Sequence, residues 1–241
     1  FPRYTDYSRL NPGPKRMEKS YRQRVFRAYR PLEDLSRKLK ISRYSSYENP
    51  TGIVFEAGDT IGIRMEGSPR TKVEFIVRDF REHGRETRFP INQGANHFTV
   101  EHFGHGYVNY RDSDPDTAPP IKLQIEGGYI NGVFTHHDDA RVWKHMMKHA
   151  RSEMFDILGE RTQWVLDTKA LREQCPEQGP ELIKLYDEQM KLEQQLLGWE
   201  WEGIHPGNHI LGRANWNKKT YMHADGLGAS FVVGVTGGLV K

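Results

Sequence analysis

The stretch Ile61-Gly-Ile-Arg-Met-Glu66 alternates apolar residues with polar or small ones. The same period of two recurs at residues 73–78, Val-Glu-Phe-Ile-Val-Arg, and at residues 121–125, Ile-Lys-Leu-Gln-Ile. Because successive side chains of a strand point to opposite faces, this alternation is typical of strands with one buried face. Turn residues rather than helices separate these segments. We therefore predict an antiparallel β-sandwich over about residues 47–126.

Helical patterns lie on both sides of the predicted sandwich. Before it, the turn at residues 11–14 starts a helix predicted from Lys15 to Arg30, followed by a second over residues 32–39. After it, we predict helices and strands in alternation. They are a helix over 141–150 with Asp138 and Asp139 at its start, a strand over 163–168, a helix over 180–197 and a strand over 220–225. The fold class is therefore α+β.

Composition and charge exclude several classes of protein. The chain has 241 residues, one cysteine and no apolar run of 18 residues, which rules out an intrachain disulfide, a four-cysteine zinc site and a transmembrane helix. Residues 1–43 carry 13 Lys and Arg against 4 Asp and Glu, whereas the rest of the chain is acidic. We interpret this basic segment as a packed amphipathic helix with a wet cationic face, and expect no nucleic-acid partner. Binding to an anionic surface through the same segment is the alternative.

Three motifs resemble reactive or metal-binding sites without completing one. His145 and His149 have the i, i+4 spacing of a zinc helix, but Met146 stands where a general-base glutamate would be. Asp112-x-Asp114-x-Asp116 resembles the start of a calcium loop, yet lacks its glycine and its final glutamate. Cys175 has no histidine nearby in sequence. We therefore predict packed or surface histidines, a solvated acidic loop, an incidental cysteine and no metal ligand in this chain.

Aromatic residues gather near the end of the sequence. Trp199, Trp201, Trp216 and Tyr221 fall within 23 residues, interleaved with amide, imidazole, guanidinium and carboxylate groups. Rings that stack on sugar faces beside polar groups that bond hydroxyls are typical of glycan sites. The same local composition would result if the tryptophans cap a core under the long helix. The sequence leaves both interpretations open.

Five stretches occur in the order seen in enhancin-like zinc metallopeptidases, peptidase family M-sixty. The most specific of them is Asn49-Pro-Thr-Gly-Ile-Val-Phe-Glu-Ala-Gly58. The others are residues 120–125, 127–134, 198–199 and Tyr221-Met-His-Ala-Asp225. The resemblance covers roughly residues 43–241. It implies a β-sandwich followed by the first part of a mixed α/β, gluzincin-like catalytic domain.

The resemblance also implies an activity and a domain division. Its members are zinc metallopeptidases directed at mucins and other O-glycosylated proteins, and HExxH supplies two of their zinc ligands and a general base. HExxH appears nowhere in this sequence, so the chain resembles the N-terminal portion that precedes the motif, with zinc expected from residues outside it. The implied division is a basic helical segment (1–43), a β-sandwich (44–126) and an incomplete catalytic part (127–241).

The same resemblance implies substrate-binding residues. The segment Tyr221, Met222, His223, Ala224 and Asp225 matches an edge strand that lies along the bound substrate in gluzincins, while Trp216 is a glycan platform by its chemistry alone. The implied partners are an O-glycosylated protein or mucin and the remainder of the same polypeptide. The implied location is secreted or at a bacterial cell surface. A non-catalytic glycan- or glycoprotein-binding module is the competing hypothesis.

Overall fold

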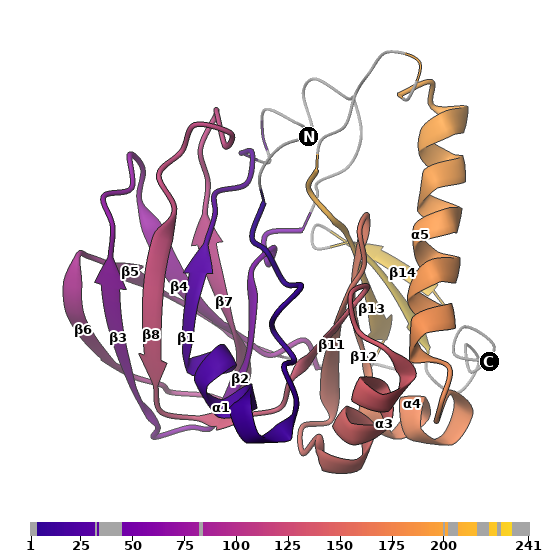
Figure 1. The fold of residues 1–241 in the computed structure, drawn as a ribbon, viewed down its shortest axis with the longest axis horizontal. Coiled ribbons are helices and arrows are strands. Elements are labelled where there is room, and N and C mark those ends of the chain that lie inside the picture. The colour runs from indigo at the N-terminus through magenta and orange to yellow at the C-terminus, as the bar shows by residue number, and fades with distance from the viewer. Residues whose placement is uncertain are drawn as a thin grey trace. The chain divides into compact units, whose positions relative to one another are not determined.

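The computed structural model describes residues 4–31, 33, 45–81, 84–199, 201, 207–215, 222–225 and 228–232. The chain forms two compact units. The first contains residues 2–31 and 46–133, and the second contains residues 1, 32–45 and 134–241. The described helices and strands of both units carry the labels of Figure 1. Among the described residues, no helix is long and apolar enough to cross a membrane.

The first unit is the predicted β-sandwich. Its elements are α1 (Pro14–Arg22), β1 (Gln23–Phe26), β2 (Pro50–Phe55), β3 (Thr60–Glu66), β4 (Val73–Arg78), β5 (Glu86–Ile91), β6 (Gly94–Thr99), β7 (Gly104–Tyr110), β8 (Ile121–Glu126) and β9 (Tyr129–Ile130). One sheet has the order β1-β8-β3-β6 and the other β5-β4-β7-β2-β9, and every pair for which a register is described is antiparallel.

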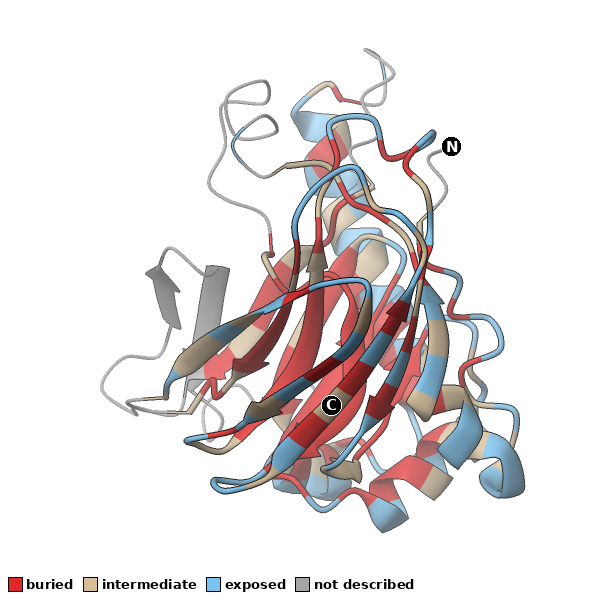
Figure 2. Ribbon diagram, turned by 90° about the vertical axis from the view of Figure 1, so that its left-hand side faces the viewer, coloured by how far each residue is buried: buried red, intermediate tan, exposed pale blue. Residues whose placement is uncertain are grey.

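Register and periodicity together build the sandwich core. Strand β3 alternates buried and exposed residues, as the alternating colours of the strands in Figure 2 show. Ile63 pairs with Ile125 across β3 and β8, and both side chains are about 1% exposed. The second sheet buries Phe75 and Val77 in the same apolar cluster. The prediction of an antiparallel sandwich is therefore confirmed.

The helix predicted over residues 15–30 is half as long as expected. It ends at Arg22, because Gln23 takes an extended conformation and residues 23–26 pair with β8 as strand β1. Burial of Phe26 in the sandwich core stabilises this pairing more than the helical stripe would. Most of the second predicted helix, residues 34–39, lies outside the described residues. The predicted boundaries at residues 43 and 126 stay predictions.

Tyr21 anchors helix α1 to the sandwich. Tyr21 is fully buried, and its hydroxyl donates to Asn11 Oδ1 at 2.7 Å and accepts from the Val133 amide at 2.9 Å. Its ring lies against Gly52 of β2, where any Cβ would overlap it and where φ is +72°. Gly52 therefore allows both the close approach and the irregular register of β2.

The second unit is a mixed sheet with helices. Its elements are β10 (Val133–Thr135), α3 (Ala140–His149), β11 (Met154–Leu158), β12 (Thr162–Asp167), α4 (Thr168–Gln174), α5 (Gly179–Leu196), β13 (Ile210–Asn215), β14 (Met222–Asp225) and β15 (Gly228–Val232). The sheet order is β10-β11-β12-β13-β15-β14. Strands β12, β13 and β15 run parallel, while β11 and β14 pair antiparallel to their neighbours.

Two helices cover one face of this sheet. Trp143 of α3 packs edge-on against Phe155 of β11, with ring centroids 6.0 Å apart. Tyr186 of α5 stacks on Trp164 of β12 at 4.0 Å. Phe155 and Trp164 lie on the same face, because Trp164 pairs with a residue two positions after Phe155. The predicted helices over 141–150 and 180–197 and the strands over 163–168 and 220–225 are confirmed within a residue or two.

Candidate functional site

Strand β14 lies at one of the two edges of the six-stranded sheet. Its neighbour is β15, with Met222 opposite Phe231 and Asp225 opposite Gly228. A strand with one neighbour directs every other N–H and C=O group away from the sheet. Within the part of the chain that the structure describes, β14 can therefore accept an extended peptide as an added strand.

Four of the six residues predicted to bind substrate belong to this edge. Met222, His223, Ala224 and Asp225 are the whole of β14. Trp216 and Tyr221 lie outside the described residues. The structure thus brings four of the predicted residues into one edge strand, and their role in binding substrate stays a prediction.

The aromatic cluster divides into buried and exposed members. Trp199 is 6% exposed and belongs to the core, while Trp201 is 90% exposed. Asn208 and His209, two of the polar residues between Trp201 and Trp216 in the sequence, are also buried. The packing interpretation therefore holds for Trp199, and Trp201 alone of the two described members is accessible to a ligand.

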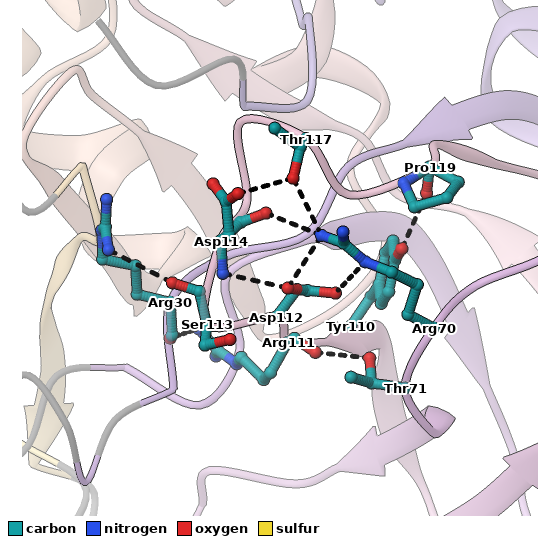
Figure 3. Close-up of polar contacts among 10 residues, drawn as sticks. All are labelled: Arg30, Arg70, Thr71, Tyr110, Arg111, Asp112, Ser113, Asp114, Thr117 and Pro119. Carbon is teal, nitrogen blue, oxygen red and sulfur yellow. Dashed lines mark hydrogen bonds and ion pairs between the residues drawn. The ribbon is translucent and has the colours of Figure 1, made fainter.

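The acidic loop after β7 is held by an arginine instead of being solvated. Asp112 is 4% exposed, and both of its carboxylate oxygens accept from Arg70 at 3.1 Å (Figure 3). The same guanidinium donates to the Asp114 carbonyl and to Thr117 Oγ1. The prediction of a solvated acidic loop is wrong for Asp112, because its carboxylate is buried and is bonded by this guanidinium instead of by water.

A cavity of about 350 Å³ lies beside α5 in the second unit. Residues of both charge signs line it, among them His136, Asp138, Glu160, Lys184 and Asp187. Asp187 accepts from the amides of residues 160, 161 and 162 and from the Thr162 hydroxyl, and so fixes the turn between β11 and β12. No sequence signal connects this aspartate to a turn 25 residues earlier, and sequence reasoning missed it.

Cys175 is a structural residue. It is 1% exposed, and burial raises the pKa of its thiol to about 11. Its carbonyl accepts from the Trp143 indole N–H at 2.8 Å. A protonated, buried thiol is a poor nucleophile, which agrees with the prediction that this cysteine is incidental.

A zinc centre does not fit the residues that the structure describes. They contain no group of three or more His, Cys, Asp or Glu side chains able to hold a metal ion. The sequence also lacks HExxH. A catalytic zinc needs three protein ligands and an activated water, so no step of a zinc mechanism is derived from these residues.

The chain is similar in fold to part of solved metallopeptidases. A metallopeptidase from Bacteroides thetaiotaomicron matches 93% of this chain at 26% identity with a TM-score of 0.84, and 40% of that protein is covered. A metallopeptidase solved in complex with Tn antigen matches 95% of the chain at 26% identity with the same TM-score, and 44% of it is covered.

The description of a third similar structure names the M60 family. The M60 catalytic domain of Clostridium perfringens ZmpC, solved with the sialyl T antigen, matches 90% of this chain with a TM-score of 0.72. At 15% identity it supports the fold alone, and 49% of it is covered. The predicted resemblance to enhancin-like, M60 metallopeptidases is confirmed. The chain spans less than half the length of each of these proteins, and no family model or curated protein matches its sequence.

Proposed function

We propose that this chain is part of a zinc metallopeptidase that hydrolyses peptide bonds in mucin-type O-glycosylated proteins. Its share of that enzyme is the sandwich, the scaffold and one wall of the substrate cleft. The observation that carries the proposal is the edge strand β14, set in a fold similar to that of a metallopeptidase solved with Tn antigen. An extended glycopeptide adds to this edge through its backbone.

Side chains around the edge strand select the glycosylated substrate in this proposal. The residues concerned are Trp216, Tyr221, Met222, His223, Ala224 and Asp225. An indole ring binds the C–H face of a sugar, and imidazole and carboxylate groups bond its hydroxyls. The zinc ligands come from the remainder of the polypeptide, and the whole protein acts outside the bacterial cell, where glycoproteins are found.

Glycopeptide binding tests the substrate part of the proposal. Calorimetry on the 241-residue chain compares a peptide that carries one O-linked N-acetylgalactosamine with the same bare peptide. We expect tighter binding of the glycopeptide, and weaker binding after Trp216→Ala. Trp201→Ala is the matched control, because Trp201 is an exposed tryptophan that is not among the proposed substrate-binding residues. Equal affinity for both peptides, or an equal effect of both substitutions, contradicts the proposal.

The catalytic part is tested on the complete gene product. Elemental analysis is expected to find about one zinc per molecule, and mass spectrometry is expected to find the glycopeptide cleaved. The 241-residue chain is expected to leave it intact, because it lacks HExxH. A complete gene product that binds the glycopeptide without zinc and without cleavage would instead be a glycoprotein-binding module.

A further inference from the structure

Helix α3 presents two histidines to solvent. His145 and His149 are one turn apart, and their ring centroids are 4.3 Å apart with 36° between the planes. His149 is exposed and His145 is half-buried, whereas Met146 and Met147 between them are buried. The two imidazoles therefore share the outer face of the helix and lie within reach of one ligand.

A hydrogen bond fixes which nitrogen of His149 is available. Its Nδ1 lies 2.7 Å from the carbonyl oxygen of His145. A carbonyl can only accept, so Nδ1 carries the hydrogen, and in the neutral ring the lone pair is on Nε2. A histidine that binds a metal almost always donates its other ring N–H to a carbonyl or carboxylate in this way.

Ion pairs limit the repulsion of a cation beside the two imidazoles. Lys144, the residue before His145, is paired with Glu177 at 2.8 Å. Arg141, one turn earlier on α3, is paired with Asp139 at 2.6 Å. Lys148, between the two histidines in sequence, carries a further positive charge on the exposed side of the helix.

We propose that His145 and His149 form a binding site for one divalent late transition-metal ion, with water in its remaining positions. Imidazole suits Cu²⁺, Ni²⁺ and Zn²⁺, and Cu²⁺ binds a given nitrogen site most strongly. With two protein ligands the site binds metal without the geometry of a hydrolytic centre. It is independent of the proposed peptidase, whose zinc ligands lie outside this chain.

Titration with Cu²⁺-iminodiacetate tests the site, because this chelate leaves room for two imidazoles in its coordination plane. The 241-residue chain is expected to bind one chelate at this site, with an electron paramagnetic resonance spectrum split by two imidazole nitrogens. His145→Ala and His149→Ala should each abolish that two-nitrogen signal. Both substitutions place a good helix former on the outer face of α3, so the fold is retained.

Two further variants test whether the signal comes from the His145–His149 pair or from histidines elsewhere in the chain. Lys144→His combined with His149→Ala keeps eleven histidines but places the second one on a different face of the helix, so the signal should stay lost. His136→Ala with His137→Ala should keep it, although those two rings also lie close together. A two-nitrogen signal that survives His149→Ala, or that disappears with His136 and His137, overturns the proposal.

Discussion

Replacing Asp187 by alanine should destabilise the second unit, because this side chain holds a turn that lies 25–27 residues earlier in the sequence. Its Oδ1 accepts from the Arg161 amide at 3.0 Å, the Thr162 amide at 3.1 Å and the Thr162 hydroxyl at 3.0 Å. Its Oδ2 accepts from the Glu160 amide at 2.6 Å. Thr162 is 2% exposed, so water cannot fully replace the lost carboxylate. The turn therefore keeps unsatisfied donors in the variant.

The size of the effect follows from these contacts. A hydrogen bond to a charged group contributes about 1.5–3 kcal/mol, and four bonds to one carboxylate are not additive. We expect Asp187→Ala to lower the free energy of unfolding by about 2–4 kcal/mol. Asp187→Asn keeps one carbonyl oxygen, which can replace the Oδ1 that takes three of the four bonds. Its cost should be about 1 kcal/mol.

Urea unfolding followed by tryptophan fluorescence measures the unfolding of the second unit, because all five tryptophans lie between residues 143 and 216. Glu188→Ala is the matched control. Glu188 is the next residue on α5, and its one described ion pair, with Lys184 at 3.9 Å, is exposed. That change should cost less than about 0.5 kcal/mol. Equal destabilisation by Asp187→Ala and Glu188→Ala would refute the argument that the carboxylate holds the turn.

Three shorter predictions concern packing, a thiol and the arginine-bound loop. Gly212→Ala should cost at least about 1–3 kcal/mol in urea unfolding, because its Cβ would overlap the Trp164 ring; an unchanged midpoint contradicts this. Since Cys175 has a pKa of about 11 and is buried, iodoacetamide at pH 8 should label it only at the rate of unfolding, as mass spectrometry can follow. Asp112→Asn weakens the pair with Arg70 and should cost about 1–3 kcal/mol, and Ca²⁺ should leave both melting temperatures unchanged.

Much of the fold could be predicted from the sequence because its signals are local. The alternation at residues 61–66 and 121–125 predicted β3 and β8, and Asp139 caps α3 by accepting from the amides of residues 141 and 142. The failures come from partners distant in sequence. Residues 23–26 carry a helical pattern, yet pairing with β8 makes them a strand. Local preference decides an element only where tertiary pairing does not oppose it.

The candidate site was less predictable than the fold, for the same reason. Asp112 is in an acidic triplet that favours a solvated loop, and only the folded chain brings Arg70, 42 residues earlier, against it. The edge position of β14 depends on a sheet order that no short segment contains. The family resemblance supplied the edge position alone, because it carries information about a whole fold rather than about one element.

The two histidines of α3 show how one spacing can have two consequences. In HExxH the residue after the first histidine must reach the water on the metal as a general base. In α3 that residue is Met146, which is 2% exposed, while His145 and His149 lie on the outer face. A glutamate at position 146 would thus be directed into the core, with a charge that burial penalises strongly. The orientation of α3 therefore permits metal binding at this spacing and prevents hydrolysis there, whichever residue stands at position 146.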